Sequence, residues 1–215
     1  MAYKQRSAQS VVEGGTGAVT LTDGGFLLGS GTGAITVTSQ PTNGQTLVGN
    51  TSSDPSLATL TGDNGITVTS GAGTITIGSK VVQIVSNLKI AGSSTTSTSL
   101  VDVTSASDTI TPTSSSNDIL VMFTWNASST NVAGNNNEQY FAILRGATQL
   151  NTTDKIFHSG ASGGGGDTHN GQMVYYYIDS PATTSATTYK LQQRNFSGSF
   201  TMTSAEINII LMEIA

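Results

Sequence analysis

The side chains best suited to metal or proton chemistry lie on both sides of one glycine-rich stretch. His158 precedes the run SGASGGGG, and Asp167 and His169 follow it. Two imidazoles and a carboxylate can bind a metal ion or transfer protons. Because ordering a segment joined by glycines costs conformational entropy, we nevertheless expect no metal site and no cofactor.

The glycine run also lacks the features of a phosphate-binding loop, since no Lys-Ser or Lys-Thr pair follows it. No H-E-x-x-H motif occurs, and no closely spaced acidic pair of the glycosidase type stands out. We therefore predict that the protein is not an enzyme. The alternative is a hydrolase for surface polysaccharide, whose carboxylates would be distant in the sequence and meet only in the fold.

Exposed loops rich in Asn, Gly, Ser and His favour binding over catalysis, because these side chains form adaptable hydrogen bonds with carbohydrate or protein. Two such loops are predicted, at 131–137 and at 160–170. The candidate ligand contacts in and beside them are Asn135, Asn136, His158, Asp167 and His169. The alternative is that these segments are solvated connections without a ligand.

The composition of the 215-residue chain indicates β structure with many turns. Only 10% of the residues are charged, 25 are Gly, and Thr recurs within apolar segments. The net charge of −5 comes with only eight Lys and Arg, so we exclude a nucleic-acid partner. No Cys is present to form disulfides. No run approaches the roughly 18 apolar residues of a membrane-spanning helix, so we expect no membrane insertion.

The chain divides into a short polar start, a repetitive segment and a compact domain. Residues 1–13 have no periodicity and are predicted to be an N-terminal attachment peptide. Residues 14–80 form a repetitive β shaft, in which a shift of about 20 residues aligns FLLG at 26–29 with TLVG at 46–49. Thr alternates with apolar residues in four predicted strands, at 18–22, 34–38, 66–69 and 74–77.

Residues 81–215 contain most of the aromatic side chains and are predicted to be a jelly-roll β-sandwich head. The predicted strands lie near 81–90, 99–104, 118–126, 138–145, 154–158, 171–178, 187–194, 199–203 and 205–214. Several of them are apolar at both odd and even positions. One face can fill the sandwich, and the other requires a further partner.

The simplest partner for the second apolar face is another copy of the chain around a symmetry axis. The alternative is a central strand that loops cover. The residues assigned to the interface between copies are Met173, Tyr175, Tyr177, Ile210 and Met212.

Two stretches add a resemblance to known families. The run GGTGAVTLTDGGFLLGSGTGAITVT resembles the repeats of bacteriophage tail fibre and virion fibre proteins. The segment YYYIDSPATTSATTYKLQQRN, followed by EINIILMEIA, is similar to the closing strands of the C1q/TNF-like jelly rolls that cap such fibres. The resemblance implies an all-β homotrimer, with a repetitive fibre shaft followed by a jelly-roll head.

The function that this resemblance implies is that of a virion structural protein. The leading hypothesis is a tail fibre that presents its head to a glycan or protein of the host surface. The alternative is a capsid decoration or head fibre protein attached to the shell through residues 1–13. Either protein would be part of the extracellular particle, assembled in the host cytoplasm with other virion proteins.

Overall fold

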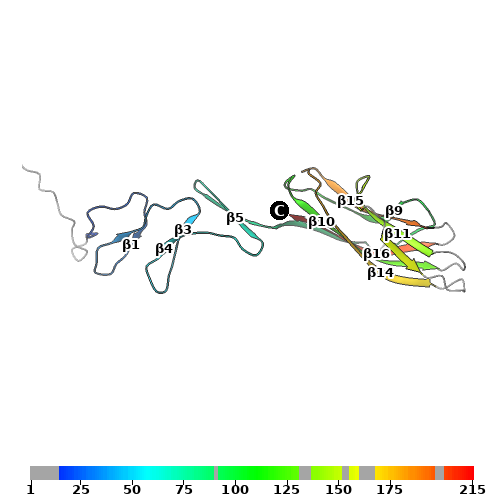
Figure 1. Cartoon of the computed structure of the whole chain (residues 1–215), viewed down its shortest axis with the longest axis horizontal. Helices are drawn as coiled ribbons and strands as arrows, with labels where there is room; N and C mark the ends of the chain where they lie inside the picture. The colour runs from blue at the N-terminus through cyan, green and yellow to red at the C-terminus, as the bar shows by residue number, and fades with distance from the viewer. Residues whose placement is uncertain (1–14, 90–91, 131–136, 152–154, 160–167, 197–200) are drawn as a thin grey trace, which may run out of the picture. The chain divides into compact units, whose positions relative to one another are not determined.

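The computed structural model consists of antiparallel β-strands throughout its described part (Figure 1). The described residues are 15–89, 92–130, 137–151, 155–159, 168–196 and 201–215. The chain divides into an N-terminal unit, Met1–Ser79, and a C-terminal unit, Lys80–Ala215. The predicted all-β class is confirmed for these residues.

Three consecutive hairpins form the described part of the N-terminal unit. They pair β1 (Leu27–Leu28) with β2 (Thr36–Val37), β3 (Gln45–Val48) with β4 (Ser56–Thr59), and β5 (Ile66–Gly71) with β6 (Thr74–Ser79). The strand predicted at 18–22 is absent from this described region. In and beside this segment the backbone makes two isolated hydrogen bonds instead of a ladder: Gly25 N donates to Thr22 O at 3.3 Å, and Ile35 N donates to Thr16 O at 2.8 Å.

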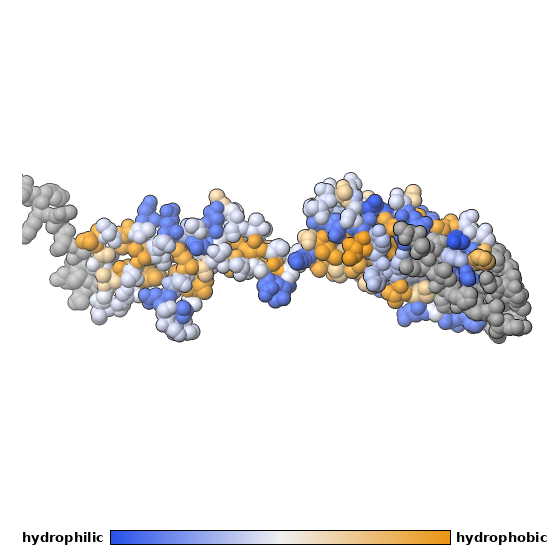
Figure 2. Space-filling view, viewed as in Figure 1, coloured by the Kyte–Doolittle hydropathy of each residue, from blue (hydrophilic) through white to orange (hydrophobic). Residues whose placement is uncertain are grey.

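Almost nothing in the described part of the N-terminal unit is buried. Among residues 15–79 only Gly44 is buried. Its φ is +79°, and a Cβ there would lie 2.0 Å from Ser70 Oγ, so the position requires glycine. Val19 is 81% exposed and Ile77 is 62% exposed. Figure 2 shows apolar side chains on the surface of this unit, which the other described residues of the unit leave exposed.

The C-terminal unit contains two antiparallel sheets. The β10 sheet has the order β14 (Thr168–Asp179), β10 (Asp118–Thr130), β16 (Met202–Ile214), β7 (Val81–Lys89), with β8 (Ser93–Thr95) also paired to β16. The β11 sheet has the order β12 (Thr148–Gln149), β11 (Asn137–Arg145), β15 (Thr187–Asn195), β9 (Val101–Ile110), with β13 (Lys155–Ser159) also paired to β11. The strands predicted at 199–203 and 205–214 are one strand, β16, because a bulge at Glu206 continues the ladder.

The two sheets pack face to face around an aromatic and aliphatic core. The rings of Trp125 on β10 and Phe141 on β11 have centroids 4.6 Å apart. Ile119, Val121 and Phe123 alternate along β10 with no exposed surface. The C-terminal unit is therefore a β-sandwich with its own hydrophobic core, as the sequence predicts.

Candidate interaction surface

The outer side of the β10 sheet carries apolar residues in addition to those that fill the core. Along β16, Ile207, Ile209 and Leu211 are buried at the core, while Ile210 and Met212 point to the opposite face. Successive residues of a strand point to opposite faces, so this strand is apolar on both. The same holds for β10, where Leu120 and Met122 alternate with the core residues.

The strand register places these outward residues in three adjoining rows. Paired residues of neighbouring strands share a face, so each row crosses β14, β10, β16 and β7. The rows consist of Ile178, Leu120, Met212 and Ile84; of Tyr176, Met122, Ile210 and Ser86; and of Val174, Thr124, Asn208 and Leu88. We call these residues the outer apolar face.

The outer apolar face is uncharged, and its residues on β14 and β7 are exposed while those on β10 and β16 are half-buried. Tyr176 is 68% exposed, and Leu88 is 62% exposed. None of its residues is Asp, Glu, Lys or Arg. An exposed apolar patch of this kind is a candidate interaction site, and its lack of charge places no like-charge contact in it.

The structure separates the predicted interface residues into two groups. Ile210 and Met212 lie on the outer apolar face, and their contact with another copy stays a prediction. Tyr175 belongs to the core, and Met173 and Tyr177 pack against that core. The outward assignment of these three residues is therefore wrong.

The error concerns the phase of β14, that is, which of its alternate side chains point towards the core. Tyr175 pairs with Phe123 of β10, so its side chain takes the same inward direction. The exposed residues of this strand are instead Val174, Tyr176 and Ile178. Since both sets are apolar, the sequence pattern of this strand does not distinguish its two faces.

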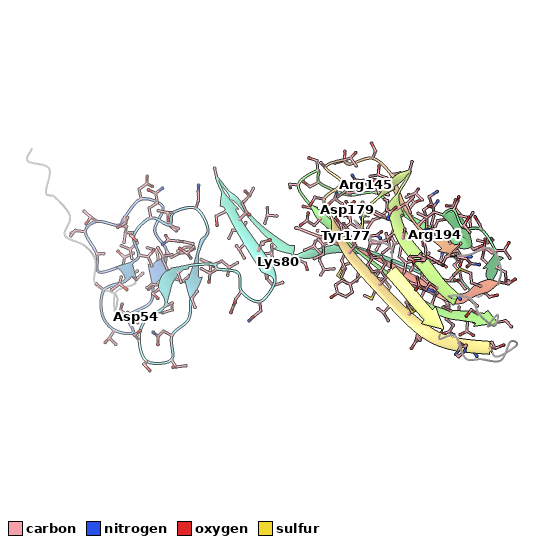
Figure 3. The ribbon with its side chains drawn as sticks, turned by 45° about the vertical axis from the view of Figure 1, so that its right-hand side comes forward. Asp54, Lys80, Arg145, Tyr177, Asp179 and Arg194 are labelled. Carbon is pink, nitrogen blue, oxygen red and sulfur yellow. The ribbon has the colours of Figure 1, made fainter. Side chains whose placement is uncertain are left out.

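A partly buried ion pair helps to turn the end of β14 inward. Asp179, the last residue of β14, accepts hydrogen bonds from Arg145 Nη1 at 2.8 Å and from Tyr189 Oη at 2.6 Å. Figure 3 shows Arg145 beside Asp179. Burial and the hydrogen bond to Asp179 raise the pKa of the Tyr189 phenol. Because Arg145 and Tyr189 belong to the β11 sheet, this cluster joins the two sheets and turns Asp179 inward.

A second buried carboxylate holds the end of β16. Glu213 accepts hydrogen bonds from Gln83 Nε2 at 2.6 Å, from Asn117 Nδ2 at 2.7 Å, and from the backbone and hydroxyl of Thr113 at 2.7 and 2.8 Å. Burial raises the pKa of Glu213, but the hydrogen bonds together lower it by more, so the pKa of this carboxyl is about 2. The carboxylate thus stays ionised and joins β16 to β7 and to the segment before β10.

The structure describes only two of the five candidate ligand contacts. Asn135, Asn136 and Asp167 lie outside the described residues. His158 lies in strand β13, and His169 lies in β14 rather than in a loop, because the ladder with β10 extends to Thr168. His169 pairs with Ser129 on the inward face, so it does not present an exposed ligand contact. Within the described residues, no group of three or more His, Cys, Asp or Glu could hold a metal ion.

The residues that sequence reasoning missed are the outward residues of β7 and β14. Ile84 and Leu88 alternate with polar Gln83 and Asn87, a pattern that typically places the apolar residues inward. The structure instead leaves both Ile84 and Leu88 exposed.

In the part of the chain that the structure describes, no helix has the length and hydropathy needed to cross a bilayer.

These features define a β-sandwich protein with an uncharged, partly exposed apolar face. No protein-family model and no curated protein matches the sequence. Among solved structures, the chain is similar to one titled "Structure of infectious bursal disease virus Gx strain", with 11% sequence identity and a TM-score of 0.33. The similarity covers 65% of this chain and 35% of that chain, so the matched region spans about a third of that protein's length.

Proposed function

We propose that the chain is a virion structural protein, a trimeric fibre that presents its C-terminal unit to a host surface. The observation that carries the proposal is the N-terminal unit, where Gly44 alone is buried among residues 15–79. Repeats that cannot bury their own apolar side chains bury them against further copies. Three chains wound side by side would cover residues such as Val19 and Ile77.

The C-terminal unit supports the same assembly through a separate surface. The outer apolar face needs a cover, and an identical copy offers an uncharged face of the same kind. The strand order also fits the jelly roll that the sequence resemblance implies, with β14, β10, β16 and β7 in one sheet and β13, β11, β15 and β9 in the other. Such heads are trimers in the fibres that the sequence resembles.

The proposed role is mechanical and adhesive, without catalysis. Residues 1–13 would attach the fibre to other virion proteins, and the C-terminal units would contact a host glycan or protein. Because one fibre carries several identical C-terminal units, weak individual sites would act together and gain in avidity.

Electron microscopy of intact particles tests this role. We would label the particles with a gold-conjugated antibody against residues 80–215. Gold at the tail or baseplate is the expected result for an adhesive fibre. Gold scattered over the shell would contradict it and indicate a capsid decoration protein, and particles without label would contradict a virion role altogether.

A further inference from the structure

The outer side of the β10 sheet becomes polar beyond the outer apolar face. There the sheet carries a hollow of about 440 Å³, within the roughly 300–1,000 Å³ typical of small-molecule sites. Its lining includes the backbone of Ala127 and Gly171. We call the side chains that surround it, Asn126, Ser128, Asn170, Gln172 and Ala205, the carboxamide hollow.

A β-bulge creates the hollow. Thr124 pairs with Asn208 and Asn126 pairs with Ala205, so β16 has one residue more than β10 between these pairs. The extra residue bends β16, and the small side chain of Ala205 leaves space between the longer amides. At the bulge, Glu206 Oε2 accepts a hydrogen bond from Asn126 Nδ2 at 2.5 Å.

The backbone conformation at the bulge favours glycine, but the residue there is Glu206. Glu206 has a φ of 51°, a left-handed conformation that costs about 1–2 kcal/mol for a residue with a Cβ. Glycine adopts it without that cost. Backbone strain of this kind occurs often at functional positions, so Glu206 is a candidate functional residue.

The chemistry of the hollow selects an uncharged ligand rich in hydroxyl groups. Asn126, Asn170 and Gln172 each carry a carbonyl acceptor and an NH₂ group. The carboxylate of Glu206, next to the lining residue Ala205, already accepts from Asn126 and holds this amide at the edge of the hollow. The side chains of Asn170 and Gln172 are exposed and make no hydrogen bond to any described residue. The lining contains no Lys or Arg among the described residues, so an anionic ligand would lack a counter-charge.

We propose that the carboxamide hollow binds an uncharged sugar unit of a host-surface glycan. Sugar hydroxyls both donate and accept hydrogen bonds, which matches paired carboxamides beside a carboxylate. This inference rests on the proposed adhesive role and gives it a site and a ligand class. The lining residues lie on hydrogen-bonded strands rather than on loops, so little backbone ordering is needed when the sugar binds.

The test is binding of the fluorescently labelled full chain to a printed array of uncharged oligosaccharides of glucose, galactose, mannose and N-acetylglucosamine. Acidic glycans are printed beside them. We compare Glu206→Gly with Ser105→Gly, since Ser105 also has a left-handed backbone, with a φ of 65°, in the other sheet. Both changes relieve backbone strain, and only the first removes the carboxylate at the hollow.

We expect the parent chain and Ser105→Gly to bind one or more uncharged glycans. Glu206→Gly should melt no lower than the parent and lose at least ten-fold in signal. Gln172→Ala, which leaves the bulge unchanged, should lose several-fold. Absence of binding to every uncharged glycan, binding to acidic glycans alone, or an unchanged signal for Glu206→Gly would each overturn the inference.

The oligomeric mass keeps this test separate from that of the proposed function. Glu206→Gly should leave the mass of the full chain unchanged. A lower mass would overturn the inference, because the hollow would then be a contact between copies. A trimeric fibre that binds no uncharged glycan would refute the sugar site and leave the proposed fibre role intact.

Discussion

The N-terminal and C-terminal units are both built from antiparallel strands rich in Thr and Val, but they differ in what one copy buries. Among the described residues of the N-terminal unit, only Gly44 is buried. The C-terminal unit encloses a continuous core that includes Trp125, Phe123 and Tyr189. Similar local patterns therefore lead to one unit that is complete in a single chain and one that is not.

The difference shows that an alternating strand pattern does not by itself make a unit stable. An isolated two-stranded hairpin is marginal in water, and three in sequence add little unless their apolar sides are covered. The two sheets of the C-terminal unit cover each other. The described residues of the N-terminal unit supply no such cover, and further copies are the source we propose.

The largest expected effect is the difference in thermal unfolding between the two units when each is made as a separate fragment. We expect residues 80–215 to unfold in one cooperative thermal transition, because they contain the core. Residues 15–79 alone, as a monomer, should show no cooperative transition in circular dichroism, because they bury almost nothing. A cooperatively melting monomer of residues 15–79 would break the comparison.

The next effect concerns assembly of residues 80–215 through the outer apolar face. Tyr176→Asp should convert this fragment from an oligomer to a monomer, because a charge would be buried without a partner. The control is Ser107→Asp, on an exposed position of β9 in the other sheet, which should keep the parent mass. If light scattering gave Tyr176→Asp the mass of the parent, the outer apolar face would not be the contact between copies.

A smaller effect is acid sensitivity, which should be specific to the C-terminal unit. The pKa of Glu213 lies near 2 in the fold and at an ordinary 4.5 when unfolded, so its ionised form stabilises the fold above pH 4.5. This contribution is lost as the pH falls from 4.5 towards 2. The melting temperature of Glu213→Gln should therefore depend less on pH in this range.

The control for this acid effect is Asp54→Asn, which removes an exposed carboxylate of the N-terminal unit. It should keep the pH dependence of the parent. Equal slopes for the parent and Glu213→Gln would mean that the buried hydrogen bonds do not hold Glu213 in its ionised form.

The smallest expected effect is at the turn between β5 and β6. Gly73 has a φ of +72° and open space around its Cβ position, so Gly73→Ala should destabilise this hairpin by about 1 kcal/mol through backbone strain alone. Gly73→Asn should cost less, since Asn tolerates this conformation. The measurement is thermal melting of the N-terminal unit in the assembled full chain, and equal melting in the two variants would refute the strain argument.

Much of the fold could be predicted from local sequence signals. Alternation along β5 and β6, and Asn and Gly at 43–44 and 64–65, indicate strands and turns where the structure has them. The strand at 18–22 could not be rejected in this way, because its alternation is regular and only the lack of a pairing strand excludes it. Pairing depends on long-range contacts that a local pattern does not contain.

The candidate site was less accessible to sequence reasoning. The pattern indicates that β14 and β16 are apolar on both faces, but it does not specify which face of β14 is outward. That phase depends on the register with β10 and on Asp179, a charged residue that points inward to Arg145. The bulge at Glu206 carries no glycine signal, so the hollow beside it also required the structure.

The most direct test of the account is the mass of the full chain in solution. One chain has a mass of 22.0 kDa, and light scattering at micromolar concentration should give three times this value. The trimer would explain how both the N-terminal unit and the outer apolar face are covered. A stable, folded monomer of 22.0 kDa would contradict the account, because both apolar surfaces would then be exposed to water.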